Sequence, residues 1–316
     1  MLRIVLQRAV QAVIVLVLVS AITFLLVNLA PGGPSSLMRM DATPEQRAAL
    51  ALRLGLDQPL PLRYLQWVGG AITGDLGISM TSNEPVGQRI AQRLPNTLIL
   101  AITALSLSVA VGIPMGVLAA LRRGRLADII TALLSVIGVS VPAFWLAILL
   151  ILLLSVNLNL LPSSGIASSG REGDLADRLQ HLLMPAIVLS TTVLPYVVRF
   201  TRSALLDVLH QDYVRTATAK GLSNVKVVYG HALRNALVPV VSIIGTLVPR
   251  LVGGAVVTEA VFGWPGMGRL AVEAANGRDY PLIVGITVIV ATVVIVTSLI
   301  VDVAYTWLDP RIRLAA

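Results

Sequence analysis

The sequence predicts an all-α integral membrane protein with six transmembrane helices, and two observations carry this prediction. The chain has 316 residues, of which 56% are hydrophobic and only 13% are charged, and its mean hydropathy is +0.86. A soluble domain usually carries about a quarter charged residues, so this composition indicates that lipid is part of the solvent. In addition, six segments are apolar over the roughly 20 residues that a helix needs to cross a bilayer.

The expected spans follow one another along the chain. They cover about residues 10–29, 96–121, 129–156, 182–198, 236–262 and 282–306. Several contain Pro or Gly, which a membrane helix tolerates where a neighbouring helix or a water-lined cavity satisfies the freed backbone groups. For each such residue taken singly, a simple kink without a role is the preferred interpretation.

The first span follows Arg3 and Arg8, as the apolar core of a signal peptide would. Its apolar stretch is longer than the 7–15 residues of a typical signal-peptide core, and the sequence NLAPGG after it is a poor cleavage site. We therefore expect the segment 1–30 to be a retained N-terminal anchor.

The distribution of Lys and Arg predicts the orientation of the spans. With the N-terminus inside, the inner segments carry about twice the density of basic residues found in the outer segments. Both termini, including the tail 310–316, are therefore expected in the cytoplasm. The formal net charge of +8 is explained by these short basic loops and does not require nucleic acid as a partner.

The outer segment 31–94 is expected to contain short helices. Thr43, Pro44 and Gln46 form a capping-box pattern at the start of TPEQRAALALRLG, and Gly55 fits the end of that helix. After the break at DQPLP, an apolar pattern resumes around Trp67. A lid, a partner contact and simple packing of a connector are all consistent with this pattern.

The cytoplasmic loop 207–235 contains the stretch RTATAKGLSNVKVVYGHALRN, which has no acidic residue. Asp212 is expected to cap a helix that begins at Tyr213, and Gly221 to end it after Lys220. Ser223 is expected to cap a second helix that runs toward Asn235. Small side chains on the first helix allow close approach of another surface, so the loop fits either helix-in-groove docking or an ordinary basic loop.

The same stretch resembles the EAA loop of bacterial ATP-binding cassette (ABC) importer permeases, in the form found in the peptide/nickel branch. Ala217 and Gly221 fall at the second Ala and the Gly of that loop, whereas Arg215 and Thr216 replace its Glu and first Ala. The departures are those of the peptide branch. The resemblance implies that Tyr213, Arg215, Thr216, Ala217, Ala219, Lys220 and Gly221 form a coupling helix that sits in a groove of an ATPase.

Other stretches resemble the dipeptide/oligopeptide permease family in the same order along nearly the whole chain. They are LGLDQPLPLRYLQWV with GDLGIS, RLPNTLILA, SVPAFWLAILLI, GGAVVTEAVFGWPGMGRL with RDYPLI, and DVAYTWLDPRIR. One departure is PGGP after the first span, where the branch commonly has an Asp. The resemblance implies a type I ABC importer permease fold, with residues 95–309 as the permease core.

The resemblance also implies the function and the partners. The chain would be the membrane-spanning subunit of an ATP-driven importer for di- or oligopeptides and form half of the translocation pathway. Its partners would be a second homologous permease, two ATP-binding subunits and an extracytoplasmic substrate-binding protein in a bacterial cell membrane. No cofactor is expected in this chain, and ATP with Mg would bind the partner ATPases. Relatives with the same framework that carry nickel or glutathione provide the alternative.

Arg250 is the one charge expected near the middle of a span. A charged side chain at the bilayer centre costs on the order of 2.5–3.5 kcal/mol on insertion scales. Arg250 is therefore expected to face either the translocation pathway, where it would attract a peptide carboxylate, or a polar group of the second permease subunit.

Three further charged residues are candidates for a gate or a structural ion pair. Glu259 lies near the outer end of the fifth span and is expected to pair with Arg269 or Arg278. Trp264, in the turn that follows, is expected at the membrane interface. Asp302 is expected to form an anchoring pair with a cytoplasmic basic residue.

Enzymatic and secondary-transport functions are disfavoured by the residues present. The chain has no cysteine, no HExxH metal motif and no phosphate-binding loop, so neither a catalytic nor a metal site is expected. An ion-coupled secondary transporter would usually carry carboxylates or a proton relay inside its spans. The sequence therefore favours a transport subunit driven by other proteins.

Overall fold

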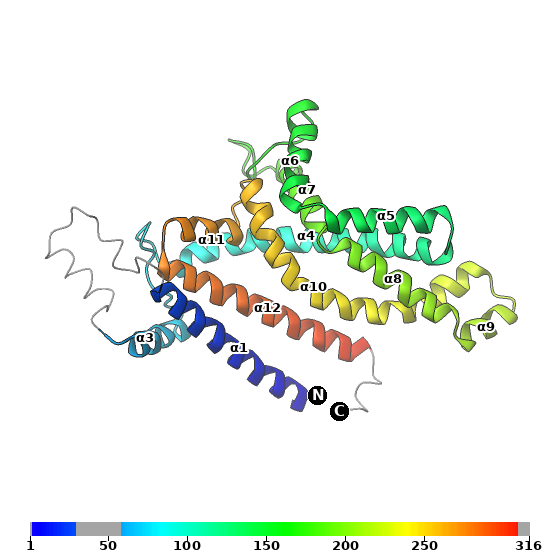
Figure 1. Cartoon of the computed structure of the whole chain (residues 1–316), viewed down its shortest axis with the longest axis horizontal. Coiled ribbons are helices and arrows are strands. Elements are labelled where there is room, and N and C mark those ends of the chain that lie inside the picture. Colours follow the sequence, from blue (N-terminus) through cyan, green and yellow to red (C-terminus); the bar gives the residue numbers. More distant parts are fainter. Residues whose placement is uncertain (1, 30–57, 309–316) are drawn as a thin grey trace. The chain divides into compact units, whose positions relative to one another are not determined.

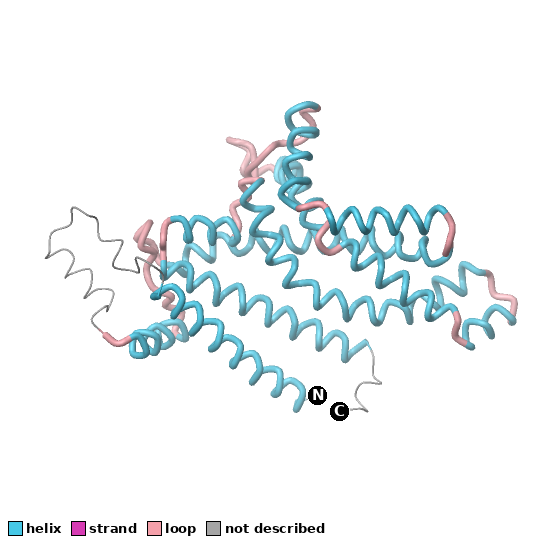
Figure 2. The backbone as a smooth tube through the Cα atoms, viewed as in Figure 1, coloured by secondary structure: helices cyan, strands magenta, loops and turns pink. Residues whose placement is uncertain are grey.

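The computed structural model describes the backbone of residues 2–29 and 58–308, and the side chains of 6–29 and 58–301. In this part of the chain, helices are joined by turns, and the only extended pairing is an isolated bridge between Ile78 and Pro85 (Figure 2). The described elements are α1 (Leu2–Leu29), α3 (Leu60–Ile72), α4 (Val86–Leu121), α5 (Leu126–Ser140), α6 (Ala143–Leu150), η2 (Ile151–Asn157), α7 (Leu175–Ser190), α8 (Leu194–Leu209), α9 (Asp212–Ala219), η3 (Lys226–Ala232), α10 (Leu233–Val261), α11 (Met267–Asn276) and α12 (Tyr280–Leu308), where η marks a π-helix (Figure 1).

Four helical stretches of the described residues are long and apolar enough to cross a membrane on their own. They are Leu6–Leu29, Val86–Leu121, Lys226–Val261 and Tyr280–Val301. The expected total of six is reached when each of two bent helix pairs is counted as one span. The prediction of an all-α membrane protein is thus confirmed, whereas two of its spans have a different form.

The third and fourth spans are not the single helices that hydropathy predicts. The α5 helix and the segment Ala143–Asn157 meet at an angle of 101°, and α7 meets α8 at 55°. Val141 is extended (φ −79°, ψ 122°) because it precedes Pro142, whose ring disfavours helical geometry in the residue before it. Figure 1 shows α6 turning sharply away from α5 at this point.

The chain divides into two compact units, which are described separately. Unit 1 comprises Met1–Pro95 and Arg269–Ile295, and unit 2 comprises Asn96–Gly268 and Val296–Ala316. The segment boundaries expected at residues 30, 94 and 309 stay a prediction. They divide the chain by function, whereas the two compact units are defined by contacts between residues.

In unit 1, α3 packs against the C-terminal half of α1. The hydroxyl groups of Ser20 and Tyr64 are 2.8 Å apart, and the ring of Phe24 lies edge-on to Tyr64 with 5.6 Å between centroids. Trp67 adds a second ring contact to Phe24 at 6.4 Å. This part of the outer segment is therefore packed on the first span, as a connector would be. The helix expected from Thr43 to Gly55 lies outside the described residues.

A buried carboxylate joins two distant parts of unit 1. Asp279, just before α12, is fully buried and accepts hydrogen bonds from Met80 N (3.1 Å), Thr81 N (3.2 Å), Thr81 Oγ1 (2.8 Å) and the Ser79 hydroxyl. Burial by itself would raise the pKa of Asp279, but these hydrogen bonds to its charged form outweigh it and hold the pKa below the usual range. The turn before α4 is thereby fixed to the start of α12.

Asp279→Asn tests this connection. The depressed pKa means that the carboxylate stabilises the fold above its unfolded pKa of about 3.9, and that this stability is lost as the pH falls through the folded pKa. We expect Asp279→Asn to lower stability at pH 7 by roughly 1.5–3 kcal/mol, as for hydrogen bonds to a charged group. Thermal unfolding of the detergent-solubilised protein between pH 3 and pH 7 should show a smaller acid-induced loss for the variant; equal losses would contradict the assignment.

In unit 2, the apolar core forms where α4, α7, α8 and α10 meet. Its buried members include Leu100, Leu189, Val197, Leu251 and Trp264. Gly116 on α4 permits the close approach of α8. A Cβ at this position would overlap both the backbone oxygen of Val198 and the Cβ of Thr201. Small residues at such crossings are typical of membrane helix packing.

Candidate functional site

The 207–235 segment forms two helical arms joined by a tight turn. The first arm, α9, ends at Ala219, and Gly221 follows with φ +80°, a left-handed conformation that favours glycine at the end of a helix. Gly221 N–H donates to Thr218 O at 3.0 Å, so the turn satisfies a carbonyl of the last helical turn. The prediction that Gly221 ends this helix is confirmed.

A small apolar cluster anchors the two arms to the rest of unit 2. Val214 of α9 is only 5% exposed and packs with Leu205 of α8 and Val227 of η3. The arms are also joined at their open end, where Asn235 Nδ2 donates to Tyr213 Oη at 2.8 Å. The segment is thus a folded projection with a defined inner side.

The outer side of this projection carries most of the residues singled out from the sequence. Tyr213, Arg215, Thr216, Ala219, Lys220 and Gly221 are exposed, and Ala217 is half-buried beside the apolar cluster. Thr216 turns its hydroxyl back to Asp212 O at 2.9 Å and so presents its methyl group without a free donor. No described residue covers this face.

Sequence reasoning missed three exposed apolar side chains after Gly221. Val225 is 67% and Tyr229 is 57% exposed on the second arm, and Leu222 is exposed in the turn before it. Apolar residues at this spacing within a basic stretch were available as a signal in the sequence. We define the coupling face as Thr216, Ala219 and Lys220 together with Leu222, Val225 and Tyr229.

One detail of the predicted loop is wrong. Helix α9 begins at Asp212, with Gln211 in the cap position, so the Asp212 side chain does not cap it and instead lies 4.0 Å from Arg215. The second helix, expected to run toward Asn235, is present, and η3 continues directly into α10.

Arg250 lies on an exposed face of α10 and contacts one aromatic residue of α8. Its Nη1 donates to Tyr196 Oη at 2.6 Å, and its Cζ lies 4.4 Å from the centroid of the Tyr196 ring. A cation over an aromatic face is stabilised by the ring quadrupole. Arg250 is thereby held in position without a carboxylate in the described contacts.

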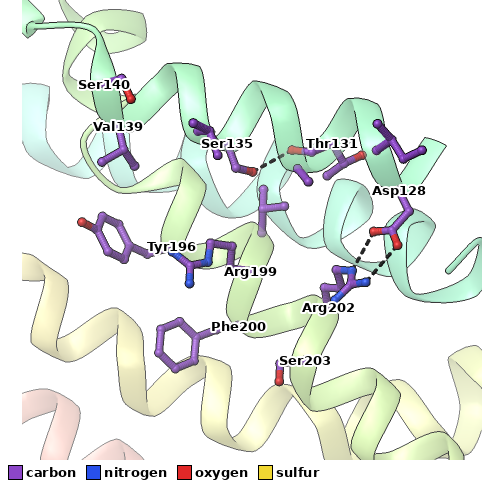
Figure 3. Close-up of a pocket in the computed structure, with 14 residues that line it drawn as sticks. Asp128, Thr131, Ser135, Val139, Ser140, Tyr196, Arg199, Phe200, Arg202 and Ser203 are labelled. Carbon is purple, nitrogen blue, oxygen red and sulfur yellow. Dashed lines mark hydrogen bonds and ion pairs between the residues drawn. The ribbon is translucent and has the colours of Figure 1, made fainter. Parts of the chain in front are cut away.

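Two more arginines belong to the same region, and sequence reasoning assigned them to a loop. Helix α8 extends to Leu209, beyond the expected end of the span at 198, so Arg199 and Arg202 lie on this helix and not in a loop. Arg202 forms a two-bond pair with Asp128 of α5, with Nε to Oδ1 at 2.7 Å and Nη2 to Oδ2 at 2.9 Å (Figure 3). Asp128 Oδ2 also accepts from Gly124 N at 2.9 Å, which ties the turn before α5 to α8.

Glu259 is fully buried at the end of α10, where the chain turns toward α11. Its Oε1 accepts from Thr97 Oγ1 at 2.6 Å and its Oε2 from Gly268 N at 2.7 Å, while Met267 N donates to Thr97 Oγ1 at 2.7 Å. The carboxylate and the threonine thus satisfy the first amides of α11 and favour its start electrostatically.

The remaining candidates at this corner have separate outcomes. Trp264 is 2% exposed and donates from Nε1 to Asn96 O at 3.1 Å, so its side chain is packed inside the protein. Its expected position at the level of the membrane interface stays a prediction. Arg269 Nε bonds Glu273 Oε1 at 2.9 Å. A pairing of Glu259 with Arg269 or Arg278 stays a prediction, and the Asp302 side chain lies outside the described residues.

Gly266→Ala tests the packing of the corner on Glu259. A Cβ at position 266 would collide with the Glu259 carboxyl group, which is fully buried and held by hydrogen bonds from Thr97 and Gly268. We expect the substitution to destabilise the protein by roughly 1–3 kcal/mol, as overpacking does. The matched control is Gly253→Ala on α10, where a Cβ meets nothing within 4 Å and little change is expected. Thermal unfolding in detergent compares the two, and equal melting temperatures would argue against a tight corner.

The bent helix pairs, the α9 projection and the long α10 define a membrane-spanning component of a transport complex. A model of the family described as binding-protein-dependent transport system inner membrane component matches residues 112–314, and a model of its N-terminal part matches residues 1–101. The chain belongs to this family. It is therefore a multi-pass permease subunit of an ABC importer, a transport subunit and not an enzyme.

Curated relatives match the chain over nearly its full length. The dipeptide transport system permease protein DppB of Escherichia coli (strain K12) is 41% identical and is covered to 99%, as is this chain. The oligopeptide transport system permease protein AppB of Bacillus subtilis (strain 168) is 41% identical over 98% of each chain. The di/tripeptide transport system permease protein DppB of Pseudomonas aeruginosa (strain UCBPP-PA14) is 42% identical over 93% of this chain and 94% of its own.

A solved structure shares the fold. A chain of the MetNI methionine ABC transporter in an inward-facing conformation superposes with a TM-score of 0.58 at 18% identity, covering 70% of this chain and 97% of its own. This likeness confirms the predicted type I ABC importer permease fold.

Proposed function

We propose that the chain forms half of the translocation pathway of an ATP-driven importer for di- or oligopeptides. The proposal is supported by three relatives that match the chain almost end to end and are named as dipeptide, di/tripeptide or oligopeptide permeases. The apolar composition of the chain also supports the proposal, because a subunit that forms half of a translocation pathway must span the membrane.

The family's dependence on a binding protein and on ATPases leads to a specific assembly. In the proposal, the chain pairs with a second homologous permease, two ATP-binding subunits bind the inner side, and an extracytoplasmic binding protein delivers the substrate. ATP and Mg²⁺ bind the ATPase subunits. The complex lies in a bacterial inner membrane, with both termini of this chain in the cytoplasm, as the distribution of basic residues favours.

The exposed coupling face is the observation that carries the proposal. A folded projection with an anchored inner side and an outer side of small and apolar groups has the form of a helix that docks into a groove. Closure of the ATPases on ATP would shift this projection, and the permease would change between two states that the ATPases bias. Arg250, exposed on α10 and stacked on Tyr196, lines the pathway in this proposal.

Cross-linking tests the proposed docking. The chain has no native cysteine, so Ala219→Cys creates a single thiol on the coupling face. In the assembled complex we expect a short bifunctional thiol reagent to link this position to an ATPase subunit, and to do so differently with and without ATP. Ile72→Cys on α3, which is 81% exposed, serves as the control and should give no such link. A link from position 72 but not from 219 would refute the docking.

Uptake by proteoliposomes tests the substrate and the energy source. The purified complex with its binding protein should accumulate dipeptides when ATP is enclosed with the ATPases, and an ionophore that collapses ion gradients should leave uptake unchanged. Nickel complexes and glutathione, offered at the same concentration, should not be accumulated. Preferential uptake of a nickel complex or of glutathione would identify that compound as the substrate instead of a peptide. Uptake without ATP would refute an ABC mechanism.

A further inference from the structure

A groove runs between α5 and α8 in unit 2, with a volume of about 870 Å³. Its walls are mostly apolar, with Ile129 and Val136 on one side and Phe200 on the other. Both helices contribute polar residues to the groove, and its cationic side chains come from α8. On that helix Tyr196, Arg199 and Arg202 follow one another at intervals of three residues and therefore lie on one helix face (Figure 3).

The charges that line the groove do not balance. Arg202 is neutralised by Asp128 through two hydrogen bonds. Arg199 is exposed in the groove and makes no hydrogen bond or ion pair with any residue whose side chain the structure describes. Arg250 adds a second positive charge next to the groove, over the ring of Tyr196.

Two polar groups of the groove, on Tyr196 and Arg199, are available as donors. Because Arg250 Nη1 donates to Tyr196 Oη, the Tyr196 hydroxyl hydrogen is left to donate elsewhere. Arg199 offers the planar fork of a guanidinium, which carries donors only and matches a carboxylate or phosphate with two parallel bonds. An acceptor with negative charge is therefore the ligand that satisfies both residues best.

Two anionic groups fit this chemistry, because a guanidinium binds the carboxylate of a peptide and the phosphate of a lipid headgroup in the same two-bond manner. Arg199 lies within α8, 10 residues before the helix ends at Leu209. The peptide import proposed above favours the carboxylate, and the experiments below separate the two ligands.

We propose that Arg199 and the Tyr196 hydroxyl bind the C-terminal carboxylate of the peptide as it passes through the groove, with Arg250 positioning Tyr196. This inference rests on the proposed peptide import. The apolar walls then accommodate peptide side chains without selecting among them, because they offer surface but no fixed hydrogen-bonding partners. The carboxylate is the group that every unmodified peptide shares, which suits a pathway that accepts many sequences.

The charge of the groove can be tested without any peptide. Ser203→Cys places a single thiol on the groove wall, one helical turn from Arg199. In the complete complex in zwitterionic nanodiscs, an anionic methanethiosulfonate should label this thiol about tenfold faster than a cationic one of similar size, because cations focus an anion into a cleft. Adding Arg199→Gln should abolish the preference. Adding Arg171→Gln, which removes an exposed arginine of the loop before α7, should retain it.

Uptake then tests the role of the carboxylate. Arg199→Gln should lower ATP-driven uptake of a free dipeptide about tenfold, the loss that corresponds to one charge-assisted hydrogen bond. Tyr196→Phe keeps the ring under Arg250 and should lower uptake less. In both variants the ratio of free dipeptide to C-terminal amide should fall toward one, a change that a general folding defect would not produce. Selection by the binding protein is the same in every arm.

Three outcomes would overturn the site. Equal labelling by the two reagents in the complete complex would mean that Arg199 is already paired, for example with an acid of the second permease. Loss of the labelling preference on addition of anionic phospholipid alone would identify a headgroup as the ligand. An unchanged ratio of free to amidated peptide in Arg199→Gln would exclude carboxylate binding. If no peptide is taken up by the wild-type complex, the proposed function fails instead, whatever the labelling shows.

Discussion

Lipid offers no hydrogen bonds, and this constraint shapes every part of the molecule. Each backbone N–H and C=O in a span must find a partner inside the protein, which is why the described residues are helical almost throughout. Hydroxyl groups follow the same rule: Thr131 donates to Ala127 O and Ser135 to Thr131 O, each one turn back along α5. The helices break at Pro142 and before Pro195, and these two breaks lie close together. Gly138, one turn before the first break, is so near Pro195 that an added Cβ would lie 3.1 Å from the proline ring.

The sequence was sufficient to predict the elements but not their bends. Hydropathy identified the spans because each is apolar over its length, and Gly221 was recognisable because a left-handed residue after a helix favours glycine. The angle of 101° after α5 depends on the break at Pro142 and on how the end of α5 packs against α8, and neither enters a hydropathy average. Arg199 and Arg202 were assigned to a loop for a related reason, since charge lowers hydropathy even where the helix continues.

The sites that depend on distant residues were the least predictable. Glu259 and Thr97 are 162 positions apart, and Asp279 bonds residues some 200 positions earlier. No periodicity or spacing rule connects such pairs, so the sequence led to a local ion-pair expectation for Glu259. The coupling segment was more legible because its helix, its turn and its exposed face are all formed within about 30 consecutive residues.

Continuity of helix from η3 to the end of α10 has a consequence for which changes the protein can accept. Lys226–Val261 is one uninterrupted stretch of 36 residues, with Tyr229 of the coupling face near its start and Arg250 about two thirds of the way along it. Each residue advances a helix by about 100°, so a single insertion between these two would swing Arg250 to another side of the rod, away from Tyr196. Such an insertion would leave composition, length and hydropathy almost untouched. The number of residues between Tyr229 and Arg250 is thus constrained, because it fixes the angle between the two side chains about the helix axis.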